Sequence, residues 1–145
     1  MISGGSGTPV GYRSVSRVQV PPNCDLLLGL VLVDKSTPGR TVWRMRAHEK
    51  FANPAGVVQG GFLAALADSA MSTAAVTFLE GRKAAVANVE MKVSFLAAVP
   101  TGDNLTATAW VVRGGKRVAF VEAEVTGGDG AAVLRASSTY LYTEL

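Results

Sequence analysis

The chain has 145 residues, about the size of one ordinary domain, and 48% of them are hydrophobic, which is enough for a buried core and argues against a disordered chain. Its formal net charge is only +3, and no run of five basic residues appears, so the composition gives no indication of a nucleic-acid partner. One cysteine, Cys24, and one histidine, His48, exclude an internal disulfide and a Cys/His zinc site, and we expect a cytoplasmic protein with no metal and no other cofactor.

The first third of the chain divides into a polar extension and a hairpin. Residues 1–20 are rich in Gly, Ser and Pro and predict a loose extension, so the domain itself is expected over residues 21–145. The apolar run at residues 26–33 is shorter than the roughly 20 residues that a membrane span needs, and it predicts a buried strand with no membrane contact. Residues 40–48 partly alternate polar and apolar side chains, and the turn at residues 36–39 predicts that the two runs pair as a hairpin.

A long helix is predicted over residues 61–79. This segment is rich in the helix formers Ala and Leu, contains no Pro, and places apolar side chains at helical spacing. Gly81 lies where a C-terminal cap is expected. Because the helix has almost no polar face, it should be buried on nearly every side, and a curved sheet supplies enough surface to bury it.

The remainder of the chain predicts β-structure. Four apolar runs are separated by Gly-containing segments, as antiparallel hairpins require, and they lie at residues 88–95, 105–112, 117–125 and 131–142. The expected order is a hairpin, one helix and a four-strand meander. The predicted fold class is therefore α+β, with one long central helix wrapped by a curved antiparallel β-sheet.

Asp68 does not fit the apolar helix that surrounds it. It is the only charged side chain between Lys50 and Glu80. Burying an unpaired carboxylate is unfavourable and Asp is a poor helix former, so folding alone does not account for its position. Asp68 either faces solvent or caps a neighbouring segment, or it faces a cleft and acts there as a general base or a nucleophile.

The start of the helix offers a second candidate feature, at Gln59, Gly60 and Gly61. A helix N-terminus presents free N–H groups and a partial positive charge, and glycine lets a ligand approach them closely. Such an end can stabilise an oxyanion, although a Gly-Gly pair is also an ordinary loop-to-helix turn. Asp68 follows Gly60 by eight residues, roughly 12 Å along a helix. A substrate must therefore bridge the two features, or a second subunit must complete the site.

Two motifs together resemble a known family. Residues 53–61 (NPAGVVQGG) and 66–70 (LADSA) resemble the signature of the hotdog-fold acyl-CoA thioesterases, in particular the phenylacetate-degradation (PaaI-like) group, and residues 88–105 resemble the strand and turn that follow it. The resemblance implies a hotdog fold over residues 21–145 and hydrolysis of an acyl-CoA thioester to a free acid and CoA. It also implies a homo-oligomer, a dimer or a dimer of dimers, with its site at the subunit interface.

The resemblance assigns roles to the matched residues. Asp68 falls on the catalytic carboxylate, which activates water or attacks the thioester itself, and Gly60 falls on the glycine whose N–H polarises the thioester carbonyl. Asn53 matches the loop residue that holds the geometry, and Asn88 matches a position on a strand that in the family comes from the other subunit. Gln59 replaces a histidine that most relatives have; it can donate a hydrogen bond but cannot move protons near neutral pH.

Four further residues are weaker candidates. Ser72 lies one turn after Asp68 and either orients the water or bonds to its own helix backbone. Arg113, Lys116 and Arg117 cluster at a predicted hairpin, where they either bind the CoA phosphates or form a solvated turn.

Two other functions compete with the thioesterase hypothesis. A hotdog dehydratase or hydratase needs a histidine at its site, and His48 lies outside the helix motif without an evident partner. A non-catalytic acyl-CoA-binding protein would explain the loss of histidine at Gln59. Such a protein gains nothing from a buried charge at Asp68, so the sequence favours the enzyme.

Overall fold

The computed structural model describes residues 20–145, so the predicted extension lies outside the described residues except for its last position. The elements follow one another as α1 (Asn23–Leu28), β1 (Val31–Asp34), β2 (Arg40–Arg46), the 3-10 helix η1 (Glu49–Phe51), α2 (Gly60–Thr77), β3 (Ala84–Phe95), β4 (Asn104–Gly114), β5 (Val118–Thr126) and β6 (Ala132–Glu144). Within this part of the chain, no helix has the length and the apolar character needed to cross a membrane.

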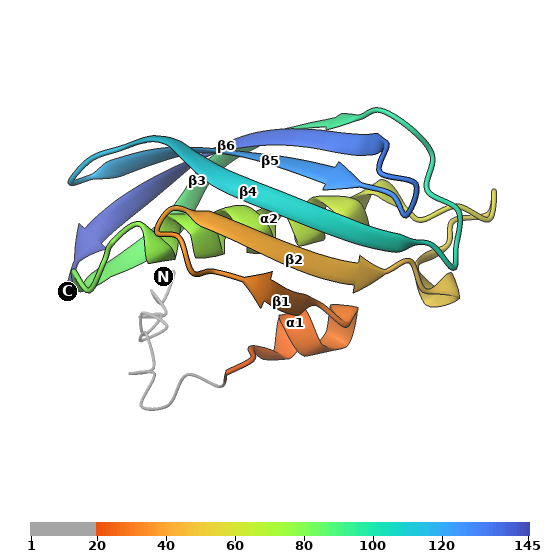
Figure 1. Ribbon diagram of the computed structural model, residues 1–145, viewed down its shortest axis with the longest axis horizontal. Helices are drawn as coiled ribbons and strands as arrows, with labels where there is room; N and C mark the ends of the chain where they lie inside the picture. Colours follow the sequence, from red (N-terminus) through yellow and green to blue (C-terminus); the bar gives the residue numbers. More distant parts are fainter. Residues whose placement is uncertain (1–19) are drawn as a thin grey trace, which may run out of the picture.

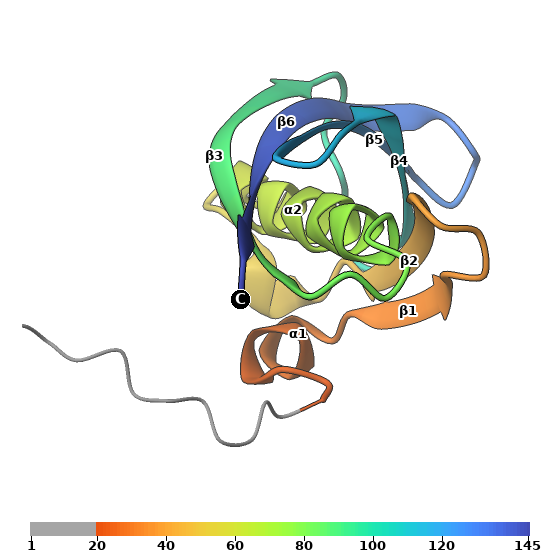
Figure 2. The same ribbon diagram turned by 90° about the vertical axis from the view of Figure 1, so that its left-hand side faces the viewer.

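The six strands form one antiparallel sheet in the order β1-β2-β4-β5-β6-β3. The helix α2 runs along the inner face of the sheet (Figure 1). Seen along the helix axis, the sheet curves around α2 from β3 to β2 (Figure 2). This arrangement confirms the predicted α+β fold class and the hotdog fold.

The last four strands are not the simple meander that the sequence predicts. β4, β5 and β6 follow one another as neighbours, but β3 pairs with β6 at the sheet edge and β4 pairs with β2. The connection from β3 to β4, at residues 96–103, is too long for a tight hairpin turn. It is held to the loop before α2 by the hydrogen bond from the Val58 N–H to the Val99 carbonyl. The connection therefore carries the chain from the edge strand β3, across the end of the sheet, to β4 between β2 and β5.

The prediction of one buried strand at residues 26–33 is wrong. The run is divided between the end of α1 and the strand β1, because Gly29 adopts a left-handed φ of 68° and caps the helix. β1 is an edge strand, so Val31 and Val33 remain 58% and 47% exposed. The predicted pairing is confirmed in part, since β1 pairs with β2 as an antiparallel hairpin.

The predicted long helix is confirmed, but its end and its burial differ from the prediction. α2 ends at Thr77 with Phe78 as its cap, and Gly81 takes its positive φ only in the turn that follows. One face of α2 is buried; its members are Leu63, Leu66, Ala67, Ala70, Met71, Ala74 and Ala75. The opposite face is half-buried, and Val76 is 49% exposed. A single chain thus leaves part of this apolar helix open.

Small side chains let the helix and sheet approach one another. The alanines on the buried face of α2 have no exposed surface, and the inward residues of β4 and β5 that oppose them include fully buried alanines as well, namely Ala107, Ala109 and Ala119. From β6, the larger Tyr140 and Tyr142 reach α2 and donate to its polar groups. The tyrosines therefore anchor one side of α2, the side that carries Asp68.

Candidate active site

Three elements meet at the Asp68 carboxylate. Asp68 lies half-buried in the middle of α2, and Asn88 on β3 and Tyr140 on β6 are direct cross-strand partners. The Asn88 Nδ2 donates to Oδ1 of Asp68 at 3.0 Å, and the Tyr140 hydroxyl donates to the same oxygen at 2.8 Å. Two donors on one oxygen hold the carboxylate in a single orientation.

The strand pattern explains why these side chains converge. Alternate residues of β6 face α2, so Ser138 and Tyr140 are buried with 2% and 1% exposure. The register of β3 shifts immediately after Asn88, a local bulge of the kind that re-aims side chains beside functional sites. Ser138 Oγ lies 2.9 Å from Asn88 Oδ1 and 2.7 Å from the Glu90 carbonyl. A hydrogen bond from Ser138 to Oδ1 leaves the Asn88 amide nitrogen directed at Asp68.

The second oxygen of the carboxylate is open. Within residues 20–145, Oδ2 of Asp68 accepts no hydrogen bond. Burial of the phenol, and then the hydrogen bond to Asp68 and its negative charge, raise the pKa of Tyr140 far above its usual range. Tyr140 therefore stays protonated at neutral pH and acts toward Oδ1 of Asp68 as a donor.

A well-anchored loop precedes the N-terminus of α2. The Asn53 Oδ1 accepts hydrogen bonds from the N–H groups of Ala55 at 2.9 Å and Val57 at 3.4 Å, and so closes the turn. The Gln59 N–H donates to the Phe51 carbonyl at 2.8 Å, which ties the end of the loop to η1. The first turn of α2 thus starts from a fixed position.

Gly60 and Gly61 each have a side chain packed closely against them, the Phe95 ring at Gly60 and the Gln59 amide at Gly61. A Cβ at Gly60 would stand 2.9 Å from the Phe95 ring, and one at Gly61 would stand 2.9 Å from the Gln59 Oε1. Among the described residues, neither N–H has a hydrogen-bond acceptor, as expected for the first turn of a helix. These donors, with Gln59 beside them, form the electropositive end of α2.

The predicted site residues form two groups in one chain. Asp68 and Asn88 are in contact, and this corrects the expectation that the strand of Asn88 comes from the other subunit. Asn53, Gln59 and Gly60 lie in the loop before α2 and at its first residue, and Gly60 precedes Asp68 by eight residues, roughly 12 Å along the helix. One chain therefore carries two separate clusters of site residues, the Asp68 group around the carboxylate and the Gly60 group around the first N–H donors of α2.

The remaining candidates do not contact Asp68. The Ser72 hydroxyl donates to the Ser69 carbonyl at 3.1 Å, within its own helix. His48 caps η1, where its Nδ1 accepts from the Lys50 N–H at 3.0 Å.

The three cationic candidates lie at or beside the β4–β5 turn, far along α2 from its N-terminus. Gly114, at this turn, packs directly against the Phe78 ring just beyond the C-terminal end of α2. Arg113 and Arg117 are exposed, and Lys116 pairs with Glu144 at 3.6 Å. Phe78 follows Asp68 by ten residues, roughly 15 Å along a helix. The turn is therefore separate from both site groups.

Tyr140 and Ser138 are the residues that the sequence interpretation missed. Both come from the strand at the C-terminal end of the chain, and no motif surrounds them. The available signal was the alternation of hydroxyl-bearing side chains at residues 138, 140 and 142, on the face that an antiparallel strand turns toward the core.

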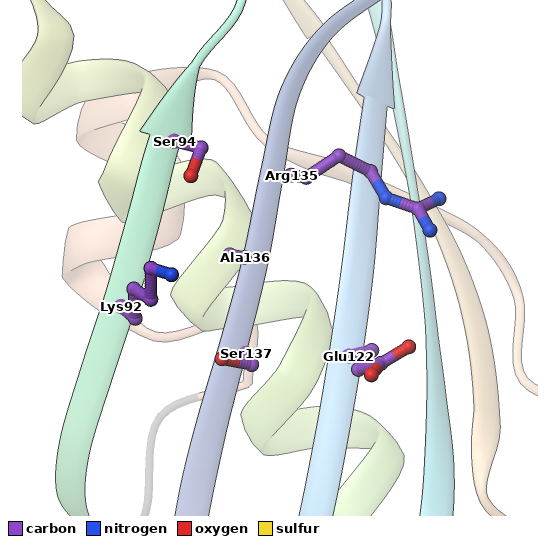
Figure 3. A pocket seen from close by; sticks show the side chains of 6 residues that line it. All are labelled: Lys92, Ser94, Glu122, Arg135, Ala136 and Ser137. Atoms are coloured by element: carbon purple, nitrogen blue, oxygen red, sulfur yellow. The ribbon is translucent and has the colours of Figure 1, made fainter.

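A cavity on the outer face of the sheet is separate from these groups. Figure 3 shows α2 behind the sheet and the six lining residues, Lys92, Ser94, Glu122, Arg135, Ala136 and Ser137. Its volume is about 190 Å³. None of the predicted site residues lines it, and its β6 residues Arg135 and Ser137 face outward, alternating with the buried Ser138 and Tyr140.

The chain thus combines a hotdog fold with a carboxylate that is held by hydrogen bonds on the central helix. Residues 55–134, more than half of the chain, match the model of the thioesterase superfamily. Human acyl-coenzyme A thioesterase 13 is 30% identical over 104 residues, which cover 72% of this chain and 73% of the relative. The chain belongs to the thioesterase superfamily, and the expected thioester hydrolase is confirmed at the level of the family.

Two solved structures share the fold. The PaaI protein of Escherichia coli, from the phenylacetic acid degradation operon, superimposes with a TM-score of 0.77 at 25% identity, over 83% of each chain. AziG of S. sahachiroi has a TM-score of 0.79 at 26% identity, over 89% of this chain and all of its own. The predicted resemblance to the PaaI-like group is thus confirmed.

Proposed function

We propose that this chain hydrolyses acyl-CoA thioesters to a free acid and CoA, with Asp68 as the general base. The observation that carries the proposal is the carboxylate of Asp68, whose Oδ1 accepts from Asn88 and Tyr140 while Oδ2 accepts no hydrogen bond from residues 20–145. The acyl-CoA thioesterase name of the human relative supports the choice of substrate class.

The reaction follows from two groups. The Asp68 carboxylate removes a proton from water, and the resulting hydroxide adds to the thioester carbonyl carbon. The Gly60 N–H, at the positive end of α2, stabilises the oxyanion that forms, and Gln59 donates a further hydrogen bond to it. The C–S bond then breaks, and the proton held by Asp68 passes to the leaving thiolate. Asn53 fixes the loop that carries the N–H donors.

The proposal includes a second copy of the chain. Since Asp68 and Gly60 of one chain lie roughly 12 Å apart along α2, the Asp68 group of one subunit needs the Gly60 group of its partner. Among the described residues, the edge strand β3 pairs only with β6, and Val89 and Phe95 on this strand and Leu96 just after it are exposed at 62%, 56% and 55%. An exposed apolar edge next to the half-open α2 is a suitable surface for a two-fold dimer, which could pair again as a dimer of dimers.

The proposal extends to the thiol end of the substrate and to the compartment. Arg113, Lys116 and Arg117 provide three cations for the phosphates of CoA. We place the protein in the cytoplasm, because Cys24 is an exposed free thiol, which suits a reducing compartment. A dehydratase or hydratase is disfavoured because His48 is engaged in capping η1.

A thiol-release assay tests the proposal. The purified protein is incubated with acetyl-, hexanoyl-, palmitoyl- and phenylacetyl-CoA, and free thiol is measured against time. We expect turnover of at least one substrate, and its loss in Asp68→Asn. Absence of turnover on the whole panel, together with saturable binding of the same thioesters, would support a non-catalytic acyl-CoA-binding protein instead.

A further inference from the structure

Three polar side chains of β6 point at α2, and they differ in what they contact. Ser138, Tyr140 and Tyr142 alternate along the strand and are all buried. Ser138 lies behind Asn88, and Tyr142 donates to the Ala75 carbonyl at 2.6 Å. Of the three, only Tyr140 contacts the Asp68 carboxylate itself. Tyr142, which contacts only the helix backbone, is therefore assigned to the fold, whereas Tyr140 can also affect the reaction.

We propose that Tyr140 is a positioning residue that fixes the orientation of the Asp68 carboxylate. The inference rests on the proposed role of Asp68 and deepens it. The Tyr140 hydroxyl lies 2.8 Å from Oδ1 and 3.4 Å from the main-chain carbonyl of Asp68, so it spans the side chain and the backbone of one residue. Rotation of the carboxylate would break the shorter of these contacts.

The physical argument concerns the freedom of the carboxylate. A half-buried aspartate in a helix can rotate about two side-chain bonds, and a single donor fixes only one of its oxygens loosely. Asn88 approaches from β3, and Tyr140, a residue that is 1% exposed, approaches from β6. A phenol has few rotatable bonds and is immobilised by packing, so it is a rigid donor. The pair therefore fixes Oδ1 from two directions and leaves Oδ2 without a donor among the described residues.

The environment keeps the phenol in the donor state. Burial and the neighbouring Asp68 charge raise the pKa of Tyr140, so the proton stays on the phenol through the neutral range. Tyr140 neither gives up its proton nor adds a charge during a reaction at Asp68. Its contribution is to geometry, and a change of geometry affects the chemical step more than substrate binding.

Tyr140→Phe and Tyr142→Phe form a matched pair. Each removes one buried hydroxyl from the same strand, and each hydroxyl donates to α2, but only the first contacts the Asp68 carboxylate. We expect Tyr140→Phe to lower kcat by roughly 10- to 100-fold with KM little changed, and Tyr142→Phe to keep kcat within about twofold. Acetyl-, hexanoyl-, palmitoyl- and phenylacetyl-CoA are the substrates, and Tm is measured for both variants. Equal kcat values in the two variants would overturn the proposal.

A second measurement works even if Tyr140→Phe does not fold. Tyrosines labelled with carbon-13 at the hydroxyl-bearing ring carbon are observed at neutral pH in the full chain and in Asp68→Asn. We expect the Tyr140 resonance to move in Asp68→Asn, because the negative charge beside the phenol is gone, and that of Tyr142, whose hydroxyl donates to the Ala75 carbonyl, to stay in place. An unchanged Tyr140 resonance would show that the contact is absent in solution and would overturn the proposal.

The two experiments also separate this inference from the proposed function. If the wild-type chain is active and Asp68→Asn is inactive, but Tyr140→Phe behaves like Tyr142→Phe, only the positioning role fails. If the wild-type chain releases no thiol from any of the four substrates, the proposed function fails and the positioning role fails with it.

Discussion

Asn88 and Tyr140 face each other as cross-strand partners on β3 and β6, and both donate a hydrogen bond to the same oxygen of Asp68. The two residues are far apart in sequence and come together only through the pairing of these strands. The register of this pair therefore fixes the orientation of the carboxylate. In the proposed enzyme, the sheet supplies the geometry and the helix supplies the reactive groups.

Mixed dimers test whether two chains build one site. Asp68→Asn removes the base, and Gly60→Ala places a methyl group beside the N–H donor, against the Phe95 ring. Each variant alone should be nearly inactive. In a mixed dimer one site combines the intact Asp68 of one chain with the intact Gly60 of the other, so equal mixing should restore about a quarter of the wild-type activity.

The same experiment can contradict the two-chain site. If Asp68 and Gly60 of one chain served the same substrate, every site in a mixed dimer would carry one defect, and thiol release would not recover after mixing. The mixed dimers are made by unfolding and refolding the two variants together. As the control, each variant is unfolded and refolded alone at the same total concentration. Sedimentation of a folded, active monomer at micromolar concentration would also argue against the proposed dimer.

The two buried tyrosines predict a loss of stability at alkaline pH. Burial raises the pKa of Tyr142, and burial together with Asp68 raises that of Tyr140, above the value of about 10 for an unfolded chain. Above pH 10 the unfolded state loses these protons first, so the folded state binds more protons and stability falls as pH rises. We expect Tm to decrease above about pH 10, and to decrease less steeply in Tyr140→Phe. A Tm profile identical in both proteins would contradict this linkage.

The cationic turn predicts a change in substrate binding. Replacing Arg113, Lys116 and Arg117 with Ala should raise KM, leave kcat nearly unchanged and weaken the dependence of KM on salt. Lys116 already pairs with Glu144, so Glu144→Gln is a useful comparison: it frees the lysine and should lower KM. If the triple variant changes neither KM nor its salt dependence, the phosphates bind elsewhere.

Much of the fold could be predicted from local patterns, and the errors arose where distant contacts decide. The helix at α2 and the strands β3 to β6 follow from helical and alternating periodicity. The run at residues 26–33 is short and apolar throughout, a pattern that does not separate helix from strand, and Gly29 divides it. The position of β3 beside β6 depends on a long connection, for which the sequence has no local signal.

Only the site residues that belong to a recognisable sequence pattern could be predicted. Asp68 was evident as a lone charge in an apolar helix, and the glycines at the helix start were evident from their position. Tyr140 was not predictable in this way, because its role depends on pairing with Asn88 across the sheet. The half-open face of α2 also has no signal within one chain, since an apolar helix has the same composition whether a sheet or a partner covers it.

The Asp68→Asn variant tests the central claim most directly. Asparagine keeps the shape of the side chain and its Oδ1, which accepts from Asn88 and Tyr140, but it removes the base. Positioned acid–base groups contribute roughly 10²–10⁴-fold, so kcat for thiol release should fall by about that factor with KM little changed. Because a half-buried charge becomes a neutral amide, Tm should hold or rise slightly. A lowered Tm with nearly normal turnover would contradict the account and would show that Asp68 serves the fold.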